Sequence, residues 1–271
     1  MSATFVGQSP RKTAIDVLIP AIEKDLGTLP FVIDSLRRYV QHPISHIYIV
    51  SPNNSKIKSL CYRKGCTFID ETTVLPFTKK DIHYSSPRWN RSGWLYQQLL
   101  KMNGDTLCRE NFFLVIDADT VLIRPHRFRS QGKSIFYCRN WSQPEYFRTY
   151  RKLLGTKAPS PKSFVTHYML FEKTKLAQLK RRIEARHGIS WHAAIIRSID
   201  KRKQFGFSEF ETYANYVYSG NSSSILLKNA RNKSLKTSVS SLGKTQTRSL
   251  AQKYRSLSFH QRKGYTRVSK P

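Results

Sequence analysis

Short apolar runs along the chain alternate with segments in which apolar residues recur every three or four positions. The runs are rich in β-branched and aromatic residues and predict strands at residues 14–21, 47–50, 66–71, 110–125, 134–140 and 163–173. The periodic segments predict helices at residues 29–40, 57–65, 91–102, 144–155, 173–188 and 191–200 and within 205–220. Because the first three strands alternate with helices, we expect an α/β fold around a mixed, mostly parallel sheet flanked by helices.

The chain is long enough for one large α/β domain followed by a basic segment. Of its 271 residues, we expect 1–13 to be a loose N-terminus and 14–220 to form the domain. We expect 221–271 to be a basic segment that either completes a ligand site or is partly disordered. The sequence has neither a membrane-spanning apolar run nor the apolar core of a secretory signal near its start, which favours a cytoplasmic protein.

The excess of positive charge bears on partners rather than on the fold. The chain has 47 Lys and Arg against 17 Asp and Glu, a net charge of +30, and its last acidic side chain is Glu211. Nucleic acid, an anionic membrane surface and an acidic small substrate each fit this balance. Because no helix-turn-helix, RNP-like, KH-like or zinc-finger pattern occurs, a nucleic-acid partner is disfavoured. The four cysteines lack CxxC spacing, and we expect them to be reduced and buried.

The strongest apolar strand runs directly into two aspartates. In FFLVIDADT, five apolar residues precede Asp117, and one residue separates it from Asp119. Ligands of open α/β sheets bind beyond the carboxyl ends of the strands. Two carboxylates there can converge on one divalent cation, and oxygen ligands suit Mg²⁺ or Mn²⁺. A bare Asp-x-Asp is also common in turns and helix caps, but the apolar run TVLIRP that follows favours a metal site that binds a nucleotide diphosphate.

The first strand is not followed by a glycine-rich phosphate loop. The letters LIPAIEKD match neither GxGxxG nor GxxxxGK, which disfavours a dinucleotide-binding or P-loop fold.

Five segments resemble, in order and spacing, those of GT-A-fold glycosyltransferases, and more narrowly those of a group of bacterial glycosyltransferase-like proteins. They are DVLIPAIEKD, RSGWLYQQLLKM, VIDADTVLIRP, THYMLFEK and FSEFETYANYV. The likeness spans roughly residues 14–220, and VIDADTVLIRP together with GWLYQQLLK is its specific part. It implies a GT-A-like fold, a nucleotide-sugar donor and Mn²⁺ or Mg²⁺ as cofactor.

The resemblance also implies roles for residues around the first strand and the aspartates. Pro20 and Ala21, at the end of the first strand, would border the base and ribose of the donor. Asp117 would contact the ribose or a metal-bound water, and Asp119 would bind the metal itself. Some GT-A enzymes complete the metal site with a C-terminal histidine, and His260 is the candidate here, although a tail histidine is more often simply exposed.

Three further residues are candidates for donor contacts. Arg91 and Lys101 share one stripe of the helix before the metal strand and would face the donor diphosphate. They could instead be solvated while the apolar side chains of that helix pack on the sheet. His167 is the polar residue of an apolar strand, and is either a sugar or acceptor contact or a satisfied core histidine.

An inverting transferase needs a carboxylate base that takes the proton of the acceptor hydroxyl. Glu209 and Glu211, in FSEFETY, are the candidates, with Glu209 preferred. If a helix starts after Ser208, both glutamates would lie in its first turn and would stabilise the helix N-terminus instead. A retaining reaction would need neither carboxylate.

The sequence therefore predicts a metal-dependent, hexosyltransferase-like glycosyltransferase that acts in cell-surface polysaccharide synthesis. It would move a sugar from a nucleotide-sugar to a hydroxyl of a glycan or glycolipid, with peripheral contact between basic residues and the anionic inner face of the membrane. One alternative is a basic nucleic-acid-binding protein. The other is a metal-dependent phosphotransferase or nuclease, although those sites usually gather more acidic residues.

Overall fold

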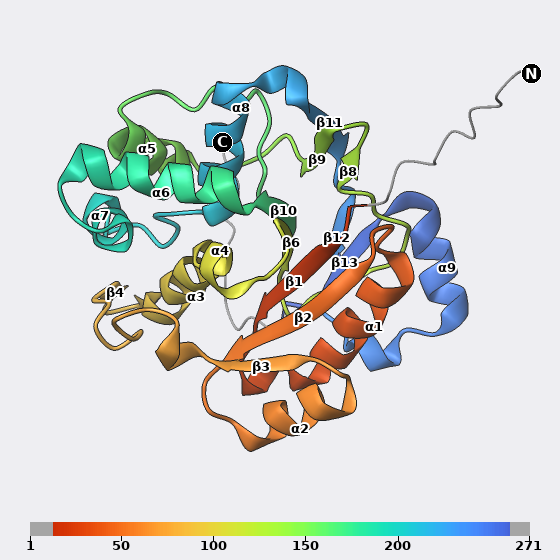
Figure 1. Cartoon of the computed structure of the whole chain (residues 1–271). Coiled ribbons are helices and arrows are strands. Elements are labelled where there is room, and N and C mark those ends of the chain that lie inside the picture. Colours follow the sequence, from red (N-terminus) through yellow and green to blue (C-terminus); the bar gives the residue numbers. More distant parts are fainter. Residues whose placement is uncertain (1–12, 261–271) are drawn as a thin grey trace, which may run out of the picture.

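Residues 13–260 are described by a computed structural model, shown in Figure 1. A five-stranded sheet with the order β10-β6-β1-β2-β3 lies at its centre. Strands β1, β2, β3 and β6 are parallel, and β10 pairs with β6 in the antiparallel sense. The prediction of a mixed, mostly parallel sheet is therefore confirmed. The strands of this sheet are β1 (Ile15–Pro20), β2 (Ile44–Ser51), β3 (Thr67–Asp70), β6 (Phe112–Ile116) and β10 (Tyr168–Glu172).

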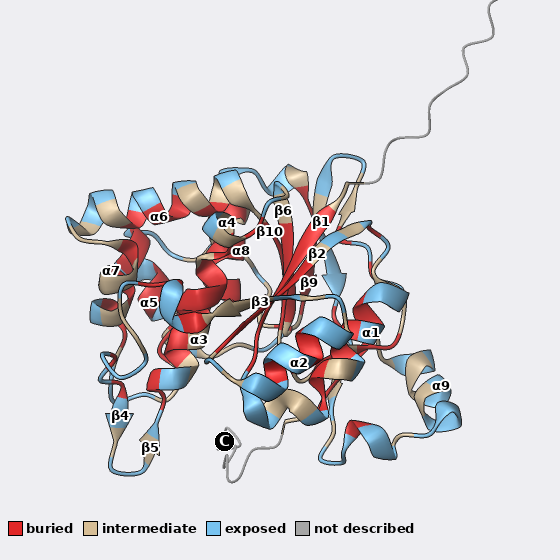
Figure 2. Cartoon of the chain, turned by 60° about the horizontal axis from the view of Figure 1, so that its bottom comes forward, coloured by how far each residue is buried: buried red, intermediate tan, exposed pale blue. Residues whose placement is uncertain are grey.

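Helices cover both faces of the sheet, because alternate residues of its strands enter two separate hydrophobic cores. Val17 and Leu114 pack in the core that α1 and α2 cover, whereas Leu18 and Val115 pack in the core that α3 and α5–α8 cover. Figure 2 shows the buried strands between these groups of helices. The helices are α1 (Leu29–Tyr39), α2 (Ser55–Arg63), α3 (Ser92–Met102), α4 (Gly104–Leu107), α5 (Pro144–Leu154), α6 (Lys173–His187), α7 (Trp191–Ser198), α8 (Glu209–Gly220) and α9 (Lys244–Lys253). Short 3₁₀ helices are η1 (Glu23–Gly27), η2 (Glu71–Thr73), η3 (Ser222–Ser224) and η4 (Val239–Ser241).

Two smaller sheets join the C-terminal segment to the rest of the fold. In one, β11 pairs in parallel with β9, and in the other β13 pairs with β7 in the antiparallel sense. The strands are β7 (Thr120–Leu122), β8 (Arg129–Ser130), β9 (Lys133–Cys138), β11 (Ile225–Asn229), β12 (Asn232–Ser234) and β13 (Ser256–Ser258). The basic segment up to residue 260 thus forms strands and a helix that return to the end of β6.

Most predicted elements occur within a few residues of their expected bounds, but two strand predictions were wrong. Residues 110–125 do not form one strand, because a turn after Ile116, closed by the Thr120 N–H on the Asp117 carbonyl at 3.1 Å, sends the chain from β6 into β7 of another sheet. The strand predicted at 163–173 begins only at Tyr168. His167 precedes it with a φ of 73°, in the left-handed region, and therefore lies outside the strand. Between β3 and α3 the chain also forms a small hairpin of β4 (Ser85–Ser86) and β5 (Trp89–Asn90).

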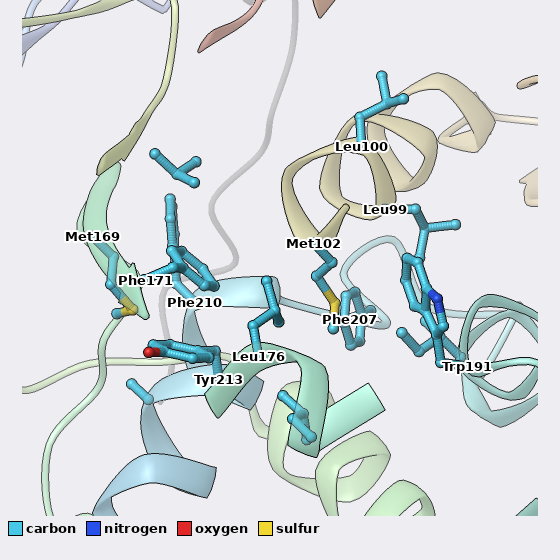
Figure 3. Close-up of a cluster of buried hydrophobic side chains, with 14 of the residues drawn as sticks. Leu99, Leu100, Met102, Met169, Phe171, Leu176, Trp191, Phe207, Phe210 and Tyr213 are labelled. Carbon is cyan, nitrogen blue, oxygen red and sulfur yellow. The ribbon is translucent and has the colours of Figure 1, made fainter. Parts of the chain in front are cut away.

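Hydrophobic packing fixes the positions of α3 and α8, two helices that carry side chains of the site. Figure 3 shows Met102 of α3 and Phe210 of α8 in one cluster with Phe171 and Tyr213, whose ring centroids lie 4.2 Å apart. Lys101 directly precedes Met102 in α3, and Glu209 directly precedes Phe210 in α8. The packed core therefore holds Lys101 and Glu209 at fixed positions on the same side of the sheet.

Two further sequence predictions concern the cysteines and the membrane. All four cysteines are free, and Cys61, Cys108 and Cys138 are buried, while Cys66 is half-buried. Among the helices within residues 13–260, none has the length and apolar character that crossing a membrane requires.

Candidate active site

A cavity of about 1500 Å³ opens at the carboxyl ends of β1, β2 and β6. Its wall includes Pro20 at the end of β1 and Ala21 directly after it, Asp117 and Asp119 after β6, and side chains from α3 and α8. Ligands of open α/β sheets bind at this edge of the strands. Of the predicted site residues, those in the wall are Pro20, Ala21, Arg91, Lys101, Asp117, Asp119, His167, Glu209 and His260.

Asp117 is held by two basic side chains from different elements. Its Oδ1 accepts a hydrogen bond from Lys101 Nζ at 2.5 Å, and its Oδ2 lies 3.0 Å from His167 Nδ1. Burial alone would raise the pKa of the Asp117 carboxyl, but Lys101 and His167 hold it well below its usual value. Asp117 is therefore an anion in the cavity wall, and both of its oxygens are engaged.

Asp119 meets the C-terminal segment. Its carbonyl accepts from the Phe259 N–H at 2.8 Å, next to the pairing of β13 with β7, and its Oδ2 lies 2.8 Å from His260 Nδ1. Burial would raise the pKa of the Asp119 carboxyl, but the hydrogen bond from His260 lowers it below its usual value. The imidazole rings of His260 and His167 have centroids 5.1 Å apart. The turn after β6 thus brings two carboxylates and two imidazoles into one corner of the cavity.

The donor types in this corner suit a divalent cation such as Mn²⁺, which binds carboxylate oxygen and imidazole nitrogen. Their present arrangement is in two pairs, Asp117 with His167 and Asp119 with His260. Within residues 13–260, no group of three or more His, Cys, Asp or Glu side chains is placed to hold a metal ion as it stands. Asp117 is also bound by the Lys101 ammonium, whereas the further side-chain contact of Asp119 is with the neutral Thr120 hydroxyl, 3.4 Å from its Oδ1.

Lys101 joins Asp117 to Glu209. Its ammonium donates to Glu209 Oε1 at 2.7 Å as well as to Asp117, and its side chain is only 4% exposed. Burial raises the pKa of the Glu209 carboxyl, and Lys101 opposes that rise. The resemblance implied that Lys101 faces the donor diphosphate, whereas the structure places its ammonium between two carboxylates.

Glu209 and Glu211 follow the helix cap Ser208 but point to different surroundings. The Ser208 hydroxyl accepts from the Glu211 N–H at 3.2 Å, as expected of an N-cap. Glu209 lines the cavity. Glu211 is fully buried elsewhere, where its Oε2 accepts from the Phe164 N–H at 2.9 Å and from Ser163 at 3.0 Å. Glu211 therefore lies outside the cavity, and its carboxylate accepts hydrogen bonds from the loop before β10.

Arg91 is buried against aromatic rings. Its guanidinium lies 4.7 Å from the Trp94 ring centroid and 4.6 Å from that of Phe205, and its Nε donates to the Gln204 carbonyl at 3.1 Å. Arg91 therefore lines the cavity as part of a packed cluster rather than as a solvated side chain.

The end of β1 is tied to neighbouring elements through its backbone. The Ala21 N–H donates to the Val50 carbonyl at 2.9 Å, and Gln97 Nε2 donates to the Pro20 carbonyl at 3.3 Å. Sequence reasoning missed Asp25, which lines the cavity nearby and whose pKa is raised by burial to about 6. It also missed Trp141 and Tyr146 in the wall, because no sequence signal separated them from ordinary loop and helix residues. Helical spacing placed Gln98 on the same stripe as Arg91 and Lys101 but gave it no role.

The fold is that of GT-A-type glycosyltransferases. Mouse xyloside xylosyltransferase 1 in its apo form is similar with a TM-score of 0.51 and 12% identity, over 96% of this chain and 100% of that one. The apo structure of the WbbM bifunctional glycosyltransferase is similar with a TM-score of 0.53 and 12% identity, over 96% of this chain but only 47% of that one. These likenesses confirm the predicted fold class.

The chain belongs to DUF6492, a family of unknown function whose model matches residues 12–253. A comparison with curated protein sequences gives no significant match.

Proposed function

We propose that the protein is a metal-dependent glycosyltransferase that uses a nucleotide-sugar donor. The observation that carries the proposal is the meeting of Asp119 and His260, at 2.8 Å, in a cavity at the carboxyl edge of a GT-A-like sheet. These residues are 141 positions apart in the chain. Pairing of β13 with β7 is what brings them together, so the C-terminal segment contributes directly to the proposed donor site.

In this proposal, Asp119 and His260 hold Mn²⁺ or Mg²⁺, with Asp117 beside them. When bound, such an ion neutralises the negative charge that develops on the departing nucleoside diphosphate. Pro20 and Ala21 border the nucleoside, because they lie on the adjacent strand end in the same cavity. Lys101 keeps Asp117 ionised and in place, and so acts as a positioning residue rather than as a diphosphate ligand.

Glu209 is the carboxylate that we assign as base. In an inverting displacement, the acceptor oxygen bonds to the anomeric carbon, the bond from that carbon to the diphosphate breaks, and the acceptor proton moves to Glu209. The electron pair of the broken bond leaves with the diphosphate. A raised pKa suits a base that works near neutral pH, and Glu209 lines the cavity whereas Glu211 does not. The acceptor is a hydroxyl of a glycan or glycolipid, and cell-surface polysaccharide synthesis, at the inner face of the membrane, is the role that we propose.

Calorimetry with UDP, GDP and CDP in the presence of Mn²⁺ tests the donor site. We expect one nucleotide to bind the wild-type protein, and Asp119→Ala to abolish that binding while the unfolding temperature is kept. Asp34→Ala is the matched control, because Asp34 is exposed on α1 and pairs with Lys64. Absence of binding by all three nucleotides to the wild-type protein would contradict the proposed function. Unchanged binding by Asp119→Ala would contradict the assignment of the site.

A further inference from the structure

Trp141 presents an open aromatic surface to the cavity. The residue is 53% exposed, lines the cavity and lies in the connection between β9 and α5. The Arg139 guanidinium lies 5.0 Å from its ring centroid and supports the indole. A large aromatic side chain kept half open to water at the edge of a cavity is an apolar surface that a ligand can cover.

Two buried polar atoms in the same wall have unused hydrogen-bonding capacity. Ser142 Oγ and Gln98 Nε2 are buried and have no hydrogen-bond partner among residues 13–260, and both residues line the cavity. Gln98 is 3% exposed, and its Oε1 is already used by the Glu209 N–H at 3.2 Å. A buried donor without a partner is costly, so a ligand that supplies acceptors is favoured at this position.

We propose that Trp141, Ser142 and Gln98 form the subsite for a carbohydrate acceptor. A sugar ring combines an apolar C–H face, which packs on an indole, with hydroxyls at its rim, which bond to buried polar groups. The cavity wall offers both kinds of group. Gln98 also bonds to the backbone of Glu209, so the subsite adjoins the proposed base. This inference rests on the proposed function and adds to it the residues that bind the sugar ring of the acceptor.

Saturation-transfer NMR with a panel of methyl hexosides and disaccharides tests the subsite without knowledge of the natural acceptor. We expect at least one sugar to receive saturation from the wild-type protein and its affinity to fall about tenfold in Trp141→Ala. Trp141→Phe should recover part of the affinity, and Ser142→Ala should lose less than Trp141→Ala does. Tyr62→Ala is the matched control, because Tyr62 is 90% exposed on α2 and outside the cavity wall.

Nucleotide binding, measured on the same variants, separates this inference from the proposed function. We expect the affinity for the nucleoside diphosphate with Mn²⁺ to be unchanged in Trp141→Ala. If the protein binds no nucleotide but its sugar binding depends on Trp141, the proposed transferase function is contradicted and the sugar subsite is supported. If no sugar in the panel binds, or if Trp141→Ala and Tyr62→Ala bind sugars equally well, the subsite is overturned.

Discussion

Two buried lysines, Lys101 and Lys180, show how differently the same kind of side chain is used in two regions of this fold. Lys101 bonds to Asp117 and Glu209 in the wall of the cavity. Lys180 of α6 bonds to Asp105 and to Asn103 Oδ1. Their side chains are 4% and 8% exposed. Burial and ion pairing alone therefore do not distinguish a site from a structural contact.

The difference lies in the balance of charge. Burial would lower the pKa of the Lys101 ammonium, but its two carboxylate partners raise it above the usual value. Burial lowers the pKa of Lys180, and Asp105 offsets only part of that effect. The cavity cluster thus holds more negative than positive charge around its lysine, which suits a place where a cation or a proton is bound. The Lys180 cluster joins α6 to α4 and serves packing.

Replacement of each lysine by methionine should separate the two clusters most strongly. Lys101→Met leaves two buried carboxylates without their cation, and we expect it to lower the free energy of unfolding by about 3–5 kcal/mol at pH 7. Lys180→Met leaves one, Asp105, and we expect a loss at the lower end of that range, about 3 kcal/mol. Urea unfolding followed by circular dichroism measures both. Equal losses of unfolding free energy in the two variants would show that the second carboxylate partner of Lys101 adds nothing to the cost of removing the lysine.

A second comparison is between the two glutamates in the first turn of α8, of which Glu209 lines the cavity and Glu211 does not. We expect Glu209→Gln to slow acceptor-dependent transfer by about 10² to 10⁴-fold, the usual contribution of a general base. Because burial raises the pKa of Glu209, the transfer rate of the wild-type protein should increase as the pH rises through that pKa. This increase should be absent in Glu209→Gln. Glu211→Gln should lower stability, by weakening the bond from the Phe164 N–H, more than it lowers the rate. A Glu209→Gln enzyme of wild-type rate would require another base or a retaining reaction.

A smaller effect on stability is expected from the protonation of His126, a buried histidine outside the cavity wall. Burial lowers its pKa from 6.5 to about 3. Between these values the unfolded chain binds a proton that the folded chain does not, so stability falls as the pH decreases. We expect a loss of about 2 kcal/mol between pH 7 and pH 5 from this residue. His126→Gln should remove that part of the pH dependence, and an unchanged profile would show that other groups cause it.

The sequence predicted the central sheet well, because its strands are continuous apolar runs that alternate with amphipathic helices. It could not predict the break after Ile116, since TVLIRP is as apolar as the strand before it and only pairing with β13 sends it into another sheet. The pairing of Asp119 with His260 followed from a resemblance, whereas the contact of Lys101 with Glu209 joins helices that sequence periodicity does not place relative to each other. Trp141 lies in a loop, where no periodic pattern marks a residue that faces a cavity.

A crystal structure with a bound metal would show whether Asp119 and His260 hold the cation. Crystals grown with Mn²⁺ and the nucleoside diphosphate that binds best would reveal the ion by its anomalous scattering. We expect a manganese peak between Asp119, His260 and the diphosphate, with the nucleoside beside Pro20 and Ala21. A nucleotide bound elsewhere, or one bound in this cavity with no manganese at Asp119, would contradict this expectation.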